Sequence, residues 1–241
     1  MKNIFVVIPV ANEEAVIEKN INDILSLNIP NFNLAIVMDD YSKDKTSDIV
    51  KRLSELDNRI HLVFHEKSTG VVSCYLHGFK HALANGADYV IEMDSGGSHD
   101  HREIPKFIQY LDQGYDCVFG SRFMRRGAMV NHPLYRRLIS WGGTILSNVF
   151  LGTKLKDMTS GYEAFNRQVL EMFDFDRFHS RGHIYQTEMR FYCRNFRIIE
   201  IPIIYRGTKS SIKTKSVIEA FKVLSLLIIE RFARQKKYLQ K

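Results

Sequence analysis

The sequence has only three cysteines, and no two of them form a C-x-x-C pair. Cys74, Cys117 and Cys193 lie far apart along the chain, a spacing that indicates neither a disulfide framework nor a cysteine metal site. We therefore expect three buried thiols in a reducing compartment.

Long apolar runs are also missing from the N-terminal region. The first apolar stretch covers residues 4–10 and is ended by Asn12, Glu13 and Glu14. A signal peptide needs a longer apolar stretch and a small-residue cleavage site. We interpret the stretch as a first strand and expect a cytoplasmic protein.

Two phosphate-binding motifs are absent. G-x-G-x-x-G does not follow the first predicted strand, and G-x-x-x-x-G-K-[ST] occurs nowhere. Dinucleotide binding of the Rossmann type and P-loop phosphate binding are therefore disfavoured. The sequence also lacks internal repeats and low-complexity tracts, which argues against repeat architectures and predicts little disorder.

Positive charge, in contrast, is in excess. The 241 residues include 34 Lys and Arg against 27 Asp and Glu, a formal net charge of +7. The excess is concentrated in residues 121–137, which hold five Arg and no acid, and in residues 206–241. Such segments favour anionic partners, either phosphates or acidic lipid headgroups. Nucleic acid is disfavoured because interleaved aromatic residues and a recognition motif are lacking.

Hydrophobic periodicity predicts alternating strands and helices. We expect strands at residues 4–8, 34–38, 60–64, 89–93, 117–119 and 197–204, and helices at residues 13–27, 46–56, 71–84, 133–151, 184–194 and 217–232. This alternation is typical of βαβ units, so the sequence predicts one α/β domain with a mostly parallel central sheet flanked by helices. The pair Gly142–Gly143 within a predicted helix indicates close packing or a bend.

Acidic residues follow two of the predicted strands. Asp39 and Asp40 end the second strand, and Asp94 follows the fourth. Ligands of such sheets bind beyond the carboxyl ends of the strands, so we expect these residues at a ligand site. Asp94 precedes a polar loop that contains Ser98 and Asp100. These three side chains are candidates to hold Mg²⁺ or Mn²⁺ against a nucleoside diphosphate.

Six motifs in order carry a family resemblance. They are IPVANEE (residues 8–14), VMDDYSKDKT (37–46), MD ahead of SH (93–94 and 98–99), GSR (120–122), PLYRRLIS (133–140) and DMTSGY (157–162). Over residues 4–215 the chain resembles inverting family 2 glycosyltransferases of the GT-A fold. Within that family it is similar to the dolichyl-phosphate mannosyltransferase-like branch, which makes polyprenyl-phosphate sugars.

The resemblance implies a role for each matching residue. The donor nucleotide would be bound by Pro9, Asn12, Glu13, Asp39, Asp40 and Lys67. Phosphate groups would be bound by Arg122, Arg136 and Arg206, whose guanidinium fork suits them. The reaction centre would include Asp157, Glu188 and Arg122, with Ser160 and Gly161 shaping the loop and Gln186 beside Glu188 on a helix that faces the sugar.

The metal motif departs from the family pattern. The family has D-x-D where this chain has Asp94-Ser95-Gly96, and Gly96 supplies no side-chain ligand. Either Ser98 or Asp100 compensates, or the metal is held more loosely.

The chemistry of the acceptor favours a phosphate. An alcohol needs a general base near neutral pH, whereas a lipid monophosphate is already anionic and mainly needs positioning. A site rich in arginine fits the second case. In-line attack of a phosphate oxygen would invert the anomeric carbon, with Asp157 or Glu188 stabilising positive charge on the sugar. His99 and His101 are more typical of loop residues than of bases.

Residues 217–232 predict an amphipathic helix. A helix of this length spans about 24 Å, which is short of a bilayer core. It either packs on the domain or lies in a membrane interface, with basic groups against anionic lipid at Arg231, Arg234, Lys236 and Lys237. We divide the chain into a GT-A domain, residues 1–215, and a C-terminal basic helix, residues 216–241, and expect a peripheral protein at the inner face of a membrane.

Other functions and several partners stay open. The same donor site would serve transfer to a sugar hydroxyl in glycan assembly, and Gly96 would also suit a non-catalytic protein that binds nucleotide-sugar. The expected partners are a nucleotide-sugar donor (GDP-mannose or a UDP-hexose), a lipid phosphate, a membrane surface, and either a membrane protein or a second copy of the chain.

Overall fold

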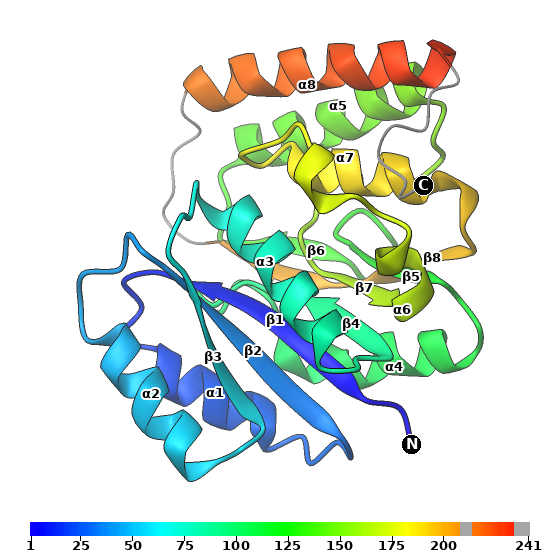
Figure 1. The fold of residues 1–241 in the computed structure, drawn as a ribbon. Coiled ribbons are helices and arrows are strands. Elements are labelled where there is room, and N and C mark those ends of the chain that lie inside the picture. Colours follow the sequence, from blue (N-terminus) through cyan, green and yellow to red (C-terminus); the bar gives the residue numbers. More distant parts are fainter. Residues whose placement is uncertain (208–213, 234–241) are drawn as a thin grey trace.

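The computed structural model describes residues 1–207 and 214–233, and its centre is a seven-stranded sheet (Figure 1). The strand order is β3-β2-β1-β4-β7-β5-β8. The strands are β1 (Ile4–Val10), β2 (Phe32–Asp39), β3 (Ile60–His65), β4 (Tyr89–Glu92), β5 (Cys117–Ser121), β7 (Glu163–Asn166) and β8 (Ile198–Pro202). A two-stranded parallel sheet pairs β6 (Ala128–Val130) with β9 (Ile204–Arg206).

Helices cover both faces of the large sheet. One face carries α1 (Ile17–Leu25), α2 (Thr46–Leu56) and α4 (Ile104–Asp112), and the other carries α3 (Val71–Ala84), α6 (Arg167–Glu171) and α7 (Tyr185–Tyr192). Short 3₁₀ turns lie at His101–Glu103, Phe175–Arg177 and Cys193–Asn195. Helices α5 (Leu134–Leu151) and α8 (Thr214–Ala233) lie together at one end, with α8 outermost (Figure 1).

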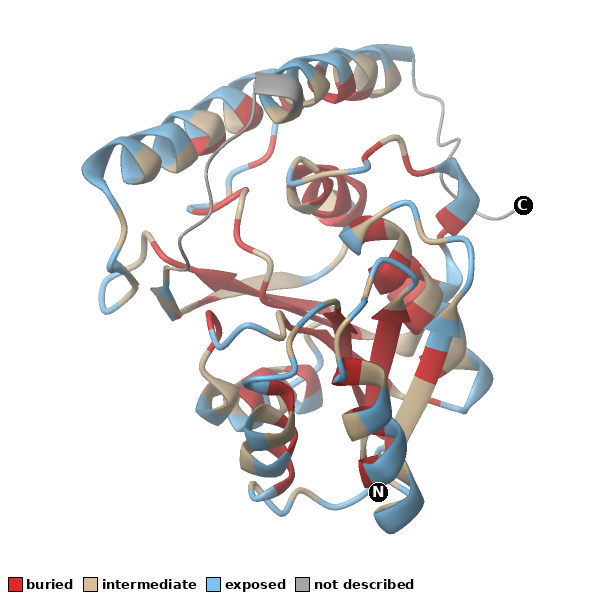
Figure 2. Cartoon of the chain, turned by 90° about the vertical axis from the view of Figure 1, so that its left-hand side faces the viewer, coloured by how far each residue is buried: buried red, intermediate tan, exposed pale blue. Residues whose placement is uncertain are grey.

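Strand β1 shows why the sheet is covered on both sides. All seven of its residues are buried. Successive side chains of a strand point to opposite faces. Phe5 and Val7 therefore join the core with α3, whereas Val6 and Ile8 join the core with α1 and α2. Figure 2 shows the buried residues concentrated in the central sheet and on the helix faces toward it.

The mostly parallel sheet predicted from the pattern is confirmed, with one exception. Strand β7 runs antiparallel to both of its neighbours, β4 and β5. It was not predicted, because two of its four residues, Glu163 and Asn166, are polar, which interrupts the apolar pattern of a buried strand. Helices α4 and α6 and strand β6 were not predicted either.

Two predicted elements have wrong boundaries. The helix expected from residue 13 begins at Ile17, and the backbone amides of Glu13 and Glu14 donate to the side chains of Thr46 and Asp44. The strand expected over residues 197–204 is two strands, β8 and β9, which belong to different sheets.

Helix α8 packs on the rest of the domain. The guanidinium group of Arg231 donates to the carbonyl oxygens of Val149 and Phe150 at the end of α5. The carboxylate of Glu219 accepts from the amide of Arg181. The boundary expected at residue 216 falls within the first turn of α8, and Arg234, Lys236 and Lys237 lie outside the described residues.

A close approach of helix to sheet occurs at a glycine that the sequence did not single out. A Cβ on Gly78 of α3 would lie 2.3 Å from Val7 Cγ1 and 2.9 Å from Val37 Cγ2. Close packing was one of two alternatives expected at Gly142–Gly143, and it is wrong for Gly142, because a Cβ there would meet nothing within 4 Å, whereas one on Gly143 would lie 3.8 Å from Thr159 Cγ2.

The two glycines make a matched pair for a stability test. We expect Gly78→Ala to lower the free energy of unfolding by about 1–3 kcal/mol, because the core is already filled. Gly142→Ala, in an open helical position, is expected to raise it by up to about 1 kcal/mol. Urea denaturation of both variants checks this, and equal stability of the two would contradict the packing of α3 on the sheet.

Candidate active site

The ends of the parallel strands bring Asp39 and Asp94 to one edge of the sheet. Strand β1 lies between β2 and β4 and is parallel to both. Consecutive residues of α3 contact the two carboxylates. Cys74 lies near enough to Asp39 that the carboxylate adds to the effect of burial in raising the pKa of its thiol, and the hydroxyl of Tyr75 donates to Asp94 Oδ1 at 2.8 Å. The two acids therefore share one site, as the strand pattern predicted.

The loops after β1 and β2 are joined by hydrogen bonds. Asn12, in the left-handed region at φ 56°, accepts from the amide of Lys43 at 2.9 Å through its side-chain oxygen. Its own amide donates to Ser42 Oγ. These contacts fix the shape of the strand-end loops. The nucleotide contacts expected of Pro9, Asn12, Glu13, Asp39, Asp40 and Lys67 stay predictions; Pro9 is buried in β1, and Lys67 is exposed after β3.

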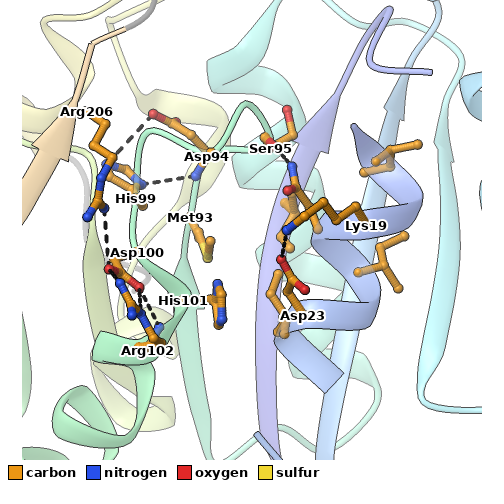
Figure 3. Close-up of a pocket in the computed structure, with 16 residues that line it drawn as sticks. Lys19, Asp23, Met93, Asp94, Ser95, His99, Asp100, His101, Arg102 and Arg206 are labelled. Carbon is orange, nitrogen blue, oxygen red and sulfur yellow. Dashed lines mark hydrogen bonds and ion pairs between the residues drawn. The ribbon is translucent and has the colours of Figure 1, made fainter. Parts of the chain in front are cut away.

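Asp94 faces a cavity of about 360 Å³ between α1 and the loop after β4 (Figure 3). Its side chain is 38% exposed, which leaves it accessible to a ligand. The amide of Asp94 donates to His99 Nδ1 at 3.1 Å, so the proton of the neutral ring is on Nε2, 3.8 Å from Asp94 Oδ2. Burial lowers the pKa of His99, which favours that neutral form.

The other two expected metal ligands have partners within the protein. The carboxylate of Asp100 accepts hydrogen bonds from Arg102 and Arg206 (Figure 3). The hydrogen bonds from Arg102 hold the pKa of Asp100 well below its usual range. Ser98 is buried beside Tyr205, with which it shares a side-chain hydrogen bond. In residues 1–207 and 214–233 no group of three His, Cys, Asp or Glu is placed to hold a metal. Of the three expected ligands, Asp94 is thus the one with a carboxylate that is not paired with an arginine.

A second cavity, of about 470 Å³, lies beneath α5 and α8. Its polar wall contains Arg122, Arg136, His132 and Tyr205. Its apolar wall comes from later turns of α5 and from α8, with Ile139, Leu146, Val217, Phe221 and Leu224. Arg122 and Arg136 are therefore brought together as expected, whereas Arg206 lies at the first cavity instead.

Tyr205 stands between the two cavities. Its ring centroid is 5.4 Å from that of His99 and 5.1 Å from that of His132, on which it stacks. The guanidinium carbon of Arg122 lies 5.6 Å from the same ring. Tyr205 lines the second cavity and His99 lines the first, so the two cavities adjoin through this pair of rings.

A buried ion pair holds Arg122 in place. Arg122 Nε lies 2.7 Å from Asp157 Oδ2 and Nη2 lies 2.8 Å from Oδ1, a bidentate contact. Burial alone would raise the pKa of Asp157, but the hydrogen bonds from Arg122 lower it below its ordinary value. Asp157 is fully buried, so its contacts favour positioning of Arg122 over direct contact with the sugar. Its predicted place at the reaction centre stays a prediction.

A buried polar group supports the loop that carries Asp157. Arg190 of α7 pairs with Glu163 and donates to the carbonyl oxygen of Ser160. Gln186 donates to Glu92 at 2.7 Å and packs against Gly161. Burial raises the pKa of Glu163 to about 7 and that of Glu92 well above its ordinary value.

Glu188 has a full set of protein partners. Its oxygens accept from the amides of His179 and Ser180 and from the hydroxyl of Tyr192. The residue is completely buried. A role at the sugar stays a prediction for Glu188, and these contacts favour a structural one.

Several residues of the site were missed by reasoning from the sequence. They are Tyr75, Glu92, His132 and Tyr205. Only Glu92 gave a signal, because it is a carboxylate inside an otherwise apolar strand. The others lie on segments far apart in the sequence, and their proximity follows from the fold.

Removal of the Asp157 charge tests the buried ion pair. We expect Asp157→Asn to lower the free energy of unfolding by about 3–5 kcal/mol, because the guanidinium group of Arg122 stays buried without its counter-charge. Combining it with Arg122→Met removes both charges and is expected to recover part of that loss. Chemical denaturation of the three proteins checks this, and an undiminished stability of Asp157→Asn would contradict the pairing.

Comparison with known proteins agrees with this geometry. Residues 5–173 match the family model of glycosyl transferase family 2. The chain is 34% identical over 172 residues to an undecaprenyl-phosphate mannosyltransferase of Micrococcus luteus, and 32% identical over 173 residues to a polyprenol monophosphomannose synthase of Mycolicibacterium smegmatis. These alignments cover 70% of this chain in each case, and 70% and 65% of the two relatives.

A solved structure shows the same fold. Glucosyl-3-phosphoglycerate synthase of Mycobacterium tuberculosis, crystallised with Mn²⁺, UDP and glucosyl-3-phosphoglycerate, superposes with a TM-score of 0.68 at 17% identity, covering 95% of this chain and 80% of that one. The GT-A fold expected from the sequence is confirmed. Because the family model covers well over half of its residues, the chain belongs to glycosyl transferase family 2 and is a glycosyltransferase.

Proposed function

We propose that the protein transfers a sugar from a nucleoside-diphosphate sugar to the phosphate of a polyprenyl monophosphate, with inversion at the anomeric carbon. The observation that supports this most directly is the second cavity, which combines two arginines with an apolar wall. An amphipathic acceptor with an anionic head and a hydrocarbon tail matches both parts. The two mannosyltransferase relatives, named for polyprenyl-phosphate substrates, agree with it.

The donor belongs at the strand ends beside Asp94. Mg²⁺ is commonly held by one or two carboxylates together with substrate phosphates, so a single free carboxylate fits a cation that binds together with the diphosphate. Asp94 would hold such a Mg²⁺ or Mn²⁺, with Ser95 close by. The bound cation supplies neutralisation of the charge that develops on the leaving diphosphate. Tyr75 orients Asp94 for this role through its hydrogen bond.

The acceptor phosphate belongs beside Arg122 and Arg136. Two guanidinium groups attract the anion and fix its orientation through charge-assisted hydrogen bonds. A phosphate oxygen then attacks the anomeric carbon while the bond to the nucleoside diphosphate breaks. Because the cavities meet at Tyr205, the sugar would lie beside this ring during transfer.

The outer faces of α5 and α8 favour a membrane surface as the place of reaction. On α5 the exposed apolar side chains recur at helical spacing, at Leu134, Leu138, Trp141, Ile145 and Val149. On α8 they are Ile218, Ile229 and Phe232. In the described part of the chain no helix is long and apolar enough to span a bilayer. Two adjacent helices with outward apolar stripes suit shallow insertion into an interface.

The buried free thiols and the proposed nucleotide-sugar substrate both support a cytoplasmic place of reaction. Cys74, Cys117 and Cys193 are buried and free, as expected for a reducing environment. We propose the cytoplasmic face of the membrane, where nucleotide sugars are made, as the site of action.

Arg136→Ala tests the acceptor site. We expect kcat/KM for a short-chain polyprenyl phosphate to fall about 10- to 100-fold, which corresponds to the loss of one charge-assisted hydrogen bond, about 1.5–3 kcal/mol. Affinity for the nucleotide is expected to stay unchanged. The assay follows lipid-linked sugar from GDP-mannose and from UDP-hexoses with Mn²⁺ or Mg²⁺ present.

The neighbouring arginine provides the control. Arg137 is exposed on the same turn of α5 and does not line the cavity, so Arg137→Ala should keep wild-type kinetics with a water-soluble acceptor. Transfer to glycan hydroxyls but to no lipid phosphate would overturn the proposal in favour of glycan assembly.

Charges on the apolar stripes test membrane binding. We expect the double variant Leu138→Glu, Phe232→Glu to lose most of its sedimentation with vesicles of acidic phospholipid, because both side chains would otherwise enter the interface. Leu56→Glu places the same charge on an exposed leucine of α2 and should bind vesicles normally. If the double variant pellets as well as wild type, the two helices do not form the membrane face.

A further inference from the structure

His132 is a polar residue of the second cavity to which the proposed reaction has not yet given a role. It lies between β6 and α5, and its ring stacks on Tyr205 with an interplanar angle of 11°. Gly207 packs against the ring edge, where a Cβ would lie 2.7 Å from Nε2. The ring is thus held in one orientation from two sides.

Both ring nitrogens are buried without a hydrogen-bond partner among the described residues. A buried polar atom without a partner costs free energy, so such an atom at a cavity wall marks a place where a ligand can supply the missing contact. A neutral imidazole offers one donor and one acceptor. The matching ligand carries both an acceptor oxygen and a proton.

The groups around the ring select an anion. Arg122 approaches from the segment after β5, Arg136 from the first turn of α5 and Tyr205 from β9, and His183 lines the same cavity ahead of α7. The described residues of α8 that line the cavity are uncharged. Positive charge therefore dominates around His132, and a phosphate monoester satisfies both the arginines and the ring.

From this geometry, and resting on the function proposed above, we infer that His132 contacts the acceptor phosphate and accepts its remaining proton. A phosphate monoester loses its second proton with a pKa of about 6, so near neutral pH a fraction arrives as the monoanion. The proton passes from the phosphate hydroxyl oxygen to an imidazole nitrogen. The freed oxygen forms the bond to the anomeric carbon, and the bond to the nucleoside diphosphate breaks with its electron pair on the leaving group.

The electrostatics of the free and bound states agree with this direction of transfer. Burial lowers the pKa of His132, and the charges of Arg136 and Arg122 lower it further, so the ring enters the reaction neutral. A bound phosphate offsets the two arginines, which raises the basicity of the ring when the proton must be taken up. After the product leaves, the arginines again favour release of the proton to solvent.

The pH dependence of His132→Gln tests the inference. Glutamine keeps hydrogen-bonding capacity but does not titrate, so the variant would use only the dianionic acceptor. We expect its kcat/KM to approach the wild-type value at pH 8 and to fall several-fold below it at pH 5.5, where most phosphate monoester is monoanionic. His132→Phe, which keeps the stacking on Tyr205, should show the same acid-side loss.

An acceptor with a more acidic phosphate separates proton transfer from simple positioning. The difluoromethylene phosphonate analogue of the same lipid stays dianionic at lower pH, so it should remove the difference between His132→Gln and wild type at pH 5.5. Nucleotide-sugar affinity measured by calorimetry should be equal in both proteins, which shows that the fold and the donor site are intact. His77→Gln, at a histidine remote from both cavities, should follow the wild-type profile.

The experiment distinguishes failure of the proposed function from failure of the proposed role of His132. If wild type transfers sugar to no lipid phosphate at any pH, the proposed function itself is wrong. If wild type is active and the ratio of His132→Gln to wild type stays constant from pH 8 to pH 5.5, only the role of His132 is overturned.

Discussion

The buried guanidinium group of Arg122 can line the second cavity only because the carboxylate of Asp157 neutralises its charge. A guanidinium group that is 6% exposed loses most of its hydration, and a bidentate carboxylate is the partner that best compensates for that loss. The ion pair also joins the segment after β5 to the loop after α5, and Glu200 of β8 accepts from the amide of Asp157. These contacts thus fix the relative positions of three segments that are distant in sequence. An anion in the cavity meets an arginine whose position is set before it arrives, which reduces the entropy lost on binding.

The first cavity presents an acidic side chain, and the second presents basic side chains. Asp94, beside the first cavity, is the available carboxylate and suits a cation accompanied by a diphosphate. Arg122 and Arg136, at the second, suit an anion without a cation. The ring of Tyr205 contacts His99, which lines the first cavity, and stacks on His132, which lines the second, so the proposed donor and acceptor sites are adjacent. In the proposed reaction, this separation keeps the diphosphate away from the arginines that would bind the acceptor.

Much of the fold was predictable, because buried parallel strands are continuous apolar runs and acidic residues mark their ends. That pattern located β1, β2 and β4 and placed Asp39 and Asp94 at one edge. Strand β7 was not predicted. Its buried Glu163 is stabilised by an ion pair with Arg190 of α7, and no local sequence pattern reveals that contact. Asp157 was predicted for the site, but its role as the partner of Arg122 depends on a fold-level contact. His132 and Tyr205 lie 73 positions apart, and the stacking of their rings has no sequence signal.

Helix α5 carries both cavity-lining side chains and the exposed apolar stripe that we propose contacts a membrane. With 3.6 residues per turn, its side chains at residues 136, 139, 140 and 146 line the cavity, whereas those at residues 134, 138, 141, 145 and 149 point outward. Arg136 is in the first turn, so the anionic head would be held at the start of the helix while the apolar wall continues along it. A lipid whose tail follows that wall reaches the outward stripe without its hydrocarbon crossing open water. In the proposed reaction, the same helix would set the distance between the acceptor phosphate and the bilayer, and that distance would have to match the position of the sugar beside Tyr205.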